Sequence, residues 1–283
     1  MHSEMENKAR LLVLGTVQFG LQYGINSSGR PVEDEVRRIL REAYSNGVRV
    51  LDTSSAYGDS EAILGRTMEN DFRIVSKYPD CDRTVSESLN RSLKCLGRDH
   101  IYGYLLHHFS TYRSKPHVWN EMISLKHSGL VSKIGFSLYA PEELEIILND
   151  GIEFDLLQIP FNIFDRRFAP YLTALRKSGV EIHARSTFLQ GLFFKNRDTL
   201  PPILQPLRPY LQDLDRYVSD NGISIAEAAL NFNLQNSCIN GVLIGVDNVE
   251  QLRMNLNSII SRKIELKIDI KEKELLNPVN WKQ

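Results

Sequence analysis

The sequence predicts an α/β protein whose strands close into a (β/α)8 TIM barrel. Eight short apolar runs recur along the 283 residues, and segments in which apolar residues recur at helical spacing separate most of them. Parallel strands joined by helices give an α/β architecture, and eight such units in one chain favour a closed barrel over an open sheet. An open doubly wound sheet would carry a G-x-G-x-x-G motif after its first strand, whereas residues 15–20 read Gly-Thr-Val-Gln-Phe-Gly. We therefore expect one barrel domain over residues 1–283.

The expected strands are the apolar runs themselves, each bounded by polar or turn-forming residues. In chain order they cover residues 11–14, 48–52, 72–76, 101–107, 133–136, 154–159, 180–184 and 241–244. Residues 186–208 contain three prolines, which predicts an ordered loop over one face of the barrel. The tail from residue 261 onward alternates charged and apolar residues without a strong signal.

The expected helices lie between these runs, where apolar residues share one face. They are centred on residues 36–43, 60–68, 85–96, 116–128, 141–147, 171–175, 211–218 and 225–234, with a last helix after 248. Asn46-Gly47, Gly97 and Ser128-Gly129 end helices, and Pro116 suits a first turn. Asn248 and Gln251 have the spacing of a capping box.

Composition indicates an ordinary globular protein without a charged partner. Hydrophobic residues make up 42% of the chain and charged residues 24%, which is typical of a packed domain. The formal net charge of −1 points to neither nucleic acid nor an acidic membrane surface. No apolar run approaches the roughly 18 residues of a transmembrane helix.

The first residues and the cysteines indicate a cytoplasmic protein. Residues 1–10 carry Glu4 and Glu6 and lack the apolar centre of a secretory signal. Cys81, Cys95 and Cys238 are odd in number and lack metal-like spacing, so we expect reduced thiols and no structural zinc.

Four polar side chains stand at or just after the ends of three expected strands. Asp52 ends the second strand, Tyr57 follows it by five residues, and Lys77 and His107 close the third and fourth. Because parallel strands present their carboxyl ends at one rim of a barrel, these side chains are expected to converge. Asp52 can also cap a turn, Tyr57 can simply pack, and Lys77 can be solvated. His107 beside His108 suggests a metal, but neighbouring strand residues point to opposite faces.

The combination of these four residues suits the reduction of a carbonyl group. A phenol has a pKa of about 10, and a nearby ammonium would favour its anion and ease proton donation. Asp52 can supply the counter-charge to Lys77, and His107 can donate a hydrogen bond that orients the carbonyl oxygen. No side chain donates hydride, so this chemistry requires a nicotinamide cofactor.

The chain resembles the aldo-keto reductase family over roughly residues 11–260. The resemblance is carried by Gly15-Thr16, Phe19-Gly20, Asp52-Thr53, Ala56-Tyr57-Gly58, Glu61 and Leu64-Gly65. It implies a TIM barrel and an NAD(P)H-dependent oxidoreductase that reversibly reduces an aldehyde or ketone to an alcohol. It also implies Tyr57 as general acid, Lys77 and Asp52 as its support, and His107 as the residue that orients the carbonyl.

The resemblance implies a set of cofactor-binding residues. Ser137 and Gln158 would hold the carboxamide, while Leu138 replaces the usual asparagine and removes one contact. Arg185 stands where a tyrosine is common, and we expect it to stack on the nicotinamide; the alternative is a salt bridge with a nearby acid. The residues expected to bind the cofactor are Gly15, Thr16, Val17, Asp52, Ser137, Gln158, Arg185, Ser186, Phe188, Gln190, Gly191, Gly245, Val246, Asp247, Gln251 and Asn255.

The choice between the two nicotinamide cofactors depends on residues at the start of the last helix. The habit of the family implies NADP(H), and the start of the last helix suits a 2′-phosphate. Many NADPH-preferring members of the family carry a lysine–serine pair and an arginine at this place. This chain has Gly245, Val246 and Gln251 instead, and Asp247 adds a negative charge beside them. Arg253 is a candidate to compensate, and NAD(H) stays open.

Two rival functions and several unknowns remain. A nucleotide-binding regulatory module of the same fold, such as the resembling potassium-channel β-subunits, would bind cofactor without significant turnover. A metal-dependent barrel hydrolase would need clustered histidines, and only His107 and His183 lie near strand ends. The partner is a small carbonyl or alcohol substrate, but the sequence identifies neither that substrate nor the oligomeric state. The expected pocket walls are Phe19, Tyr23, Phe109 and Tyr139.

Overall fold

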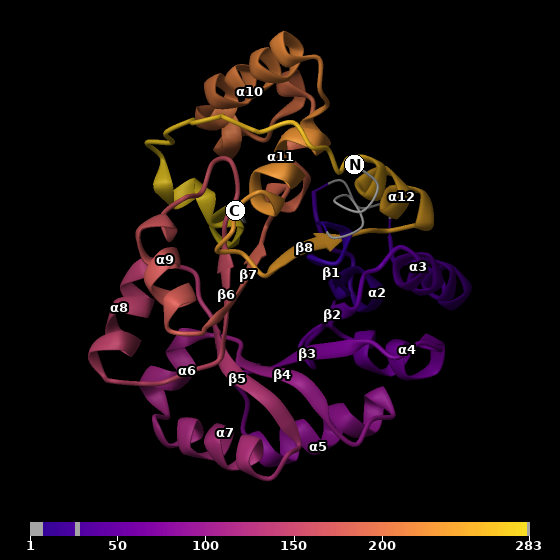
Figure 1. Cartoon of the computed structure of the whole chain (residues 1–283), viewed down its shortest axis with the longest axis vertical. Coiled ribbons are helices and arrows are strands. Elements are labelled where there is room, and N and C mark those ends of the chain that lie inside the picture. The colour runs from indigo at the N-terminus through magenta and orange to yellow at the C-terminus, as the bar shows by residue number, and fades with distance from the viewer. Residues whose placement is uncertain (1–7, 26–28, 282–283) are drawn as a thin grey trace.

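Eight parallel strands close into a barrel in the part of the chain that the structure describes, residues 8–25 and 29–281 of a computed structural model (Figure 1). Neighbours in sequence are neighbours in the barrel, and the last strand pairs with the first. The strands are β1 (Leu12–Gly15), β2 (Val50–Asp52), β3 (Arg73–Tyr78), β4 (Ile101–Leu106), β5 (Val131–Ser137), β6 (Leu156–Pro160), β7 (Glu181–Arg185) and β8 (Gly241–Gly245). The predicted (β/α)8 barrel is confirmed.

Helices cover the outside of the barrel (Figure 1). They are α2 (Val17–Gly20), α3 (Glu33–Ser45), α4 (Ser60–Thr67), α5 (Val85–Leu96), α6 (Phe109–Ser114), α7 (His117–His127), α8 (Pro141–Asn149), α9 (Ala169–Lys177), α10 (Arg208–Asn221), α11 (Ile225–Leu234) and α12 (Val249–Asn257). The sequence did not predict α6, which is short and has only two buried residues.

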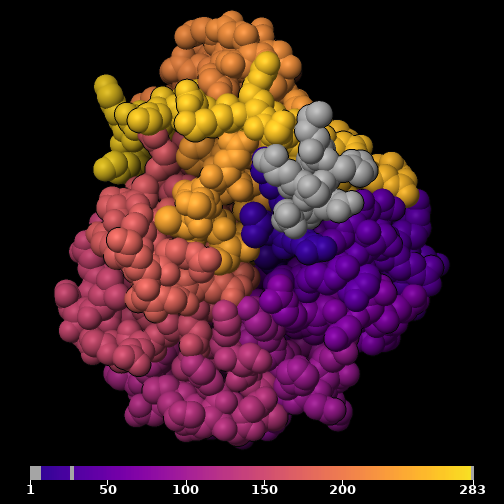
Figure 2. Space-filling view, in the orientation of Figure 1, coloured from indigo at the N-terminus to yellow at the C-terminus, as the bar shows by residue number. Residues whose placement is uncertain are grey.

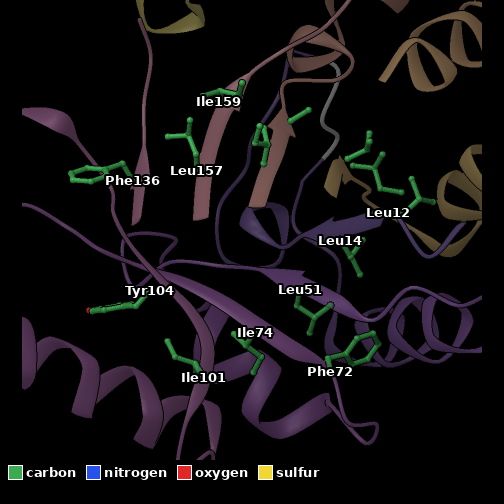
Figure 3. Packing of buried hydrophobic residues seen from close by; sticks show 14 of the residues in the cluster. Leu12, Leu14, Leu51, Phe72, Ile74, Ile101, Tyr104, Phe136, Leu157 and Ile159 are labelled. Atoms are coloured by element: carbon green, nitrogen blue, oxygen red, sulfur yellow. The ribbon is translucent and has the colours of Figure 1, made fainter. Parts of the chain in front are cut away.

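Alternate residues of each strand face the helices and the barrel interior. In β1, Leu12 and Leu14 belong to the large cluster between strands and helices (Figure 3). Val13 joins the small cluster inside the barrel. In β4, Tyr104 points outward and Leu105 inward in the same way. This period of two fixes which strand-end residues reach the mouth of the barrel.

The long segment after β7 and the C-terminal tail build a second core. Residues 186–208 contain the 3-10 helices η1 (Leu189–Phe194), η2 (Arg197–Thr199) and η3 (Pro202–Leu207). The tail runs across the surface beside α10, coloured yellow in Figure 2. Every second residue of the tail is buried in the second core, and the residues between are exposed; the buried ones are Ile264, Leu266, Ile268 and Ile270. The tail, whose charged and apolar residues alternate, is therefore an extended strap that covers α10 and α11.

Three remaining features bear on the sequence expectations. Among the described residues no helix is long and apolar enough to cross a membrane. Cys81, Cys95 and Cys238 are free thiols. Asn248 accepts a hydrogen bond from the Gln251 amide as a cap should, but the Gln251 side chain accepts from Asp247 N rather than from Asn248 N.

Candidate active site

A cavity of about 440 Å³ lies at the carboxyl ends of the strands. It is lined by Gly15, Thr16, Val17, Gln18, Tyr23, Gly24, Asp52, Tyr57, His107, Ser137, Tyr139, Gln158, Arg185, Ser186, Thr187, Phe188, Gln190, Gly191, Phe194, Ala226, Leu243, Ile244, Gly245, Asp247, Gln251, Met254 and Asn255. Its wall runs from the loop after β2 to the start of α12. Enzymes with a TIM barrel have their active sites at this end of the barrel.

The loop that carries Tyr57 is held by close backbone packing. A Cβ atom on Gly20 would lie 1.7 Å from Tyr57 O, so only glycine allows α2 to approach this closely. Gly58 follows with a φ of 55°, a conformation that favours glycine. Ser60 Oγ donates to Thr16 O at 2.8 Å, and Thr16 Oγ1 donates to Asp52 O at 3.0 Å. The first two strand-end loops are thus tied together beneath the cavity.

Asp52 and Lys77 form a buried ion pair in the floor. Lys77 Nζ donates to Asp52 Oδ1 at 2.7 Å and to Thr53 O at 2.9 Å. The other carboxylate oxygen, Asp52 Oδ2, accepts from Gln158 Nε2 at 2.7 Å. Asp52 reaches the cavity wall, whereas Lys77 is fully buried in β3, which extends two residues beyond the predicted strand end. Each charge is matched and hydrogen-bonded, as a buried pair requires.

Tyr57 lies against this pair as a neutral phenol. Lys77 Nζ is 5.0 Å from the centre of the Tyr57 ring. Burial raises the pKa of Tyr57 well above 10, the Asp52 carboxylate raises it further, and Arg185 acts in the opposite direction. The pKa of Tyr57 is raised although Lys77 lies nearby, because burial is the largest cause and Asp52 balances the charge of the ammonium. The phenol therefore keeps its proton, as a general acid must before the reaction.

His107 presents a neutral imidazole beside Tyr57. The two rings meet edge to face with centres 5.7 Å apart. Burial, with the Lys77 charge as the second cause, lowers the pKa of His107 to about 2. Ser54 Oγ accepts from Ala56 N at 3.1 Å and lies within hydrogen-bonding distance of His107 Nδ1, at 3.3 Å. In the tautomer that accepts from the Ser54 hydroxyl at Nδ1, the imidazole proton is on Nε2, where it can be donated to a carbonyl oxygen.

His108 stacks on His107 rather than pointing to the opposite face. The ring centres are 4.6 Å apart and the ring planes are nearly parallel. This is possible because His108 lies beyond the end of β4, where the alternation of a strand no longer holds. His183, the other strand-end histidine, pairs with Glu181 through Nε2 and Oε1 at 2.7 Å. Within the described residues, no three His, Cys, Asp or Glu side chains are grouped to hold a metal ion.

Nearly all the residues expected to bind cofactor line the cavity. The exception is Val246, whose side chain is buried in the core between strands and helices. Of the expected pocket walls, Tyr23 and Tyr139 line the cavity, while Phe19 and Phe109 pack against the core instead. Leu138 is fully buried.

Several cavity residues were not predicted from the sequence. Gln18, Thr187, Phe194 and Met254 all line it. Gln18 directly follows an expected contact, and Met254 lies one helical turn after Gln251, so helix periodicity could have indicated Met254. Phe194 comes from the 3-10 segment that no periodicity predicts.

The loop after β7 holds an unusual backbone conformation. Ser186, Leu189 and Gln190 have φ angles of 60°, 47° and 53°, in the left-handed region, and Gly191 follows at 90°. Such conformations cost roughly 1–2 kcal/mol per residue, and they gather at ligand-binding sites. Successive backbone amides in turns of this kind form concave sites for anions.

Three residues that line the cavity hold buried polar atoms without a hydrogen-bond partner among the described residues. They are Gln18 Oε1, Arg185 Nε and Asp247 Oδ1. Unsatisfied buried groups are rare, because each costs about 1–3 kcal/mol. An elongated polar ligand with donors and acceptors along its length, such as a dinucleotide, fits these atoms and the strained loop.

The model of the aldo/keto reductase family matches residues 11–270. The chain belongs to the aldo/keto reductase family. It is 25% identical to L-galactose dehydrogenase of Arabidopsis thaliana over 88% of this chain and 85% of that protein. It is 24% identical to L-glyceraldehyde 3-phosphate reductase of Escherichia coli K12, covering 79% and 78%. The fold matches the holo form of an aldo-keto reductase from Bacillus halodurans with a TM-score of 0.71, 19% identity and coverage of 94% and 90%.

Membership of this family makes the protein an oxidoreductase. Aldo/keto reductases act on small-molecule carbonyl compounds or alcohols and use nicotinamide cofactors. The four residues predicted from strand ends are brought together at one end of its barrel.

Proposed function

We propose that this protein is an NAD(P)H-dependent reductase that interconverts an aldehyde or ketone and its alcohol, with Tyr57 as general acid. The observation that supports this most is the contact of the neutral Tyr57 phenol with a buried Asp52–Lys77 pair on one side and a neutral His107 on the other. Asp52, Tyr57 and His107 line the cavity, and Lys77 is buried next to Asp52.

The roles of the side chains follow from their protonation. A bound nicotinamide supplies or accepts the hydride. His107 Nε2 donates to the carbonyl oxygen and holds it against the Tyr57 hydroxyl, which transfers its proton as negative charge develops on that oxygen. The adjacent Lys77 ammonium stabilises the phenolate that remains, and Asp52 keeps the ammonium charged and fixed. In the alcohol-to-carbonyl direction, the phenolate accepts the proton.

Gln158 Nε2 donates a hydrogen bond to Asp52, so Gln158 Oε1 is the atom left to accept from the carboxamide of a nicotinamide. Ser137 pairs with Gln158 in the register of β5 and β6, and both side chains line the cavity. This supports the expected carboxamide site. Because Asp52, Gln158 and Lys77 form one network, cofactor binding and the proton donor share a common support.

At the adenosine end, the side chains favour NAD(H) over the family habit of NADP(H). Asp247 Oδ1 is buried without a partner, and burial raises the pKa of this carboxyl group. A carboxylate there accepts hydrogen bonds from ribose hydroxyls and repels a 2′-phosphate. Arg253 does not compensate, because its guanidinium donates to Glu42 and Glu250 outside the cavity.

Parallel fluorescence titrations with NADH and NADPH, followed by an absorbance assay with an aldehyde panel, test the proposal. Saturable binding together with aldehyde-dependent oxidation of the cofactor supports it. Tight cofactor binding without turnover on any aldehyde of the panel would contradict it and support a nucleotide-binding regulatory module.

A further inference from the structure

Arg185 is the only arginine or lysine among the described residues that line the cavity, and the His107 imidazole there is neutral. It ends β7, and its guanidinium carbon lies 4.1 Å above the centre of the Tyr139 ring. Lys77 is buried below the floor and is matched by Asp52. The positive charge of the cavity is therefore concentrated at one place.

No carboxylate of the described residues pairs with Arg185. Asp52, on the floor, already accepts from Lys77 and Gln158. Asp247 precedes α12 at the far end. The guanidinium has five N–H donors. Two of them are used within the described chain: Nη2 donates to Leu138 O at 2.9 Å and Nη1 donates to Ser186 Oγ at 3.4 Å. The alternative of a salt bridge to a nearby acid is thus not observed.

A row of rings connects this cation to the proton donor. Tyr57 meets His107, His107 stacks on His108, His108 faces Tyr139 at 6.3 Å, and Tyr139 lies under Arg185. The charge of Arg185 is close enough to oppose the rise of the Tyr57 pKa and to add to the lowering of the His107 pKa. Tyr57, His107, Tyr139 and Arg185 all line the cavity, so a small molecule whose carbonyl lies at Tyr57 and His107 can extend within it toward the guanidinium.

We propose that Arg185 binds a carboxylate on the substrate, so that the preferred substrate is an aldehyde or ketone bearing a carboxylate apart from its reacting carbonyl. This inference rests on the proposed carbonyl-reducing function. A planar guanidinium matches a carboxylate in shape and charge, and partial exclusion of water strengthens the pair. A phosphate dianion would need a second cation, which the described lining residues do not supply.

The test compares 4-formylbenzoate with its methyl ester, two aromatic aldehydes of similar reactivity that differ in charge. We expect the wild-type protein to favour the carboxylate at least ~10-fold in kcat/KM. Arg185→Gln should reduce kcat/KM for the carboxylate by about 10- to 100-fold more than for the ester, mainly through KM. Arg185→Lys should retain part of the preference.

A control and a second anion sharpen the result. Arg176→Gln removes the same charge from an exposed position on α9 and should change neither substrate. Equal losses on both aldehydes in Arg185→Gln, with weaker cofactor binding, would show that Arg185 serves the nicotinamide and would overturn the inference while the proposed function stands. The ratio of kcat/KM for glyceraldehyde 3-phosphate to that for glyceraldehyde should be smaller than the ratio for the carboxylate to that for the ester. A larger ratio for the phosphate pair would overturn the inference in favour of a phosphate site.

Absence of turnover on every aldehyde would refute the proposed function separately. Calorimetric titration of the cofactor-loaded protein with 4-formylbenzoate then decides the inference. Binding that Arg185→Gln abolishes supports a carboxylate site, and no binding to the wild-type protein rules it out.

Discussion

Lys77 Nζ lies 2.7 Å from Asp52 Oδ1, and both side chains are buried under the cavity that Tyr57 and His107 line. Two charges in such a place are stable only together, because either one alone would be buried without a counter-charge. The pair therefore links the stability of the barrel to the placement of the proton donor.

Removing one member of the pair should destabilise the protein more than removing both. Lys77→Met should lower the free energy of unfolding by about 3–5 kcal/mol, since it leaves the Asp52 carboxylate without its cation. The double variant Asp52→Asn/Lys77→Met should recover at least ~1 kcal/mol of that loss. Urea denaturation of the four proteins in a double-mutant cycle measures this. Strictly additive losses would show that the pair is not coupled.

Stability should fall in mild acid because of His107. Its folded pKa of about 2 lies below the ordinary value of 6.5, so between these values the unfolded chain binds more protons and stability is lost as pH falls. Between pH 7.5 and 5.5 this group should cost ~1.4 kcal/mol. His107→Gln lacks this titration, so the stability difference between wild type and variant should shrink by about that amount. A difference independent of pH would contradict the burial of a neutral imidazole.

Gly20 should control the position of Tyr57 without touching substrate. In Gly20→Ala, the new Cβ would meet Tyr57 O at 1.7 Å and Ser60 N at 2.6 Å, so the catalytic loop must move. We expect kcat to fall at least ~10-fold, together with a stability loss of about 1–3 kcal/mol. Gly129→Ala is the matched control, because Gly129 has a φ of 78° and open space around it, and it should lose about 1–2 kcal/mol without loss of kcat. Equal kcat values in both variants would show that the contact of Gly20 with the loop does not position Tyr57.

Asp247 should set the cofactor preference. Asp247→Ser removes the negative charge and the unpartnered oxygen, so affinity for NADH should fall and affinity for NADPH should rise. We expect the ratio of the two dissociation constants to shift by at least ~10-fold, or ~1.4 kcal/mol. Fluorescence titrations of both cofactors measure it. A wild-type protein that binds NADPH more tightly, with a ratio that the substitution leaves unchanged, would refute the assignment.

The sequence predicts most of the barrel and the convergence at its mouth for one physical reason. Apolar runs closed by polar residues mark buried strands, and parallel strands bring their ends to one rim, so Asp52, Lys77 and His107 could be placed together from spacing alone. The strand boundaries differ by one or two residues, as for β3, because hydrogen bonding with neighbours and not local composition ends a strand.

Other features depend on contacts that spacing does not encode. The rise of the Tyr57 pKa results from burial and from the nearby Asp52 carboxylate, and both require the packed structure. The contact between Arg185 and Tyr139 joins β7 to the loop after β5. The tail gave no signal because Ile264 and its alternating neighbours pack as an extended strap without a strand partner in the described chain.

Tyr57→Phe tests the central claim most directly, because it removes one hydroxyl oxygen and leaves the ring contacts with Lys77 and His107. We expect the dissociation constant of the cofactor to change by less than ~3-fold while aldehyde reduction falls by about 100- to 10,000-fold. Reduction by Tyr57→Phe at the wild-type rate, with cofactor bound equally well, would show that another group donates the proton.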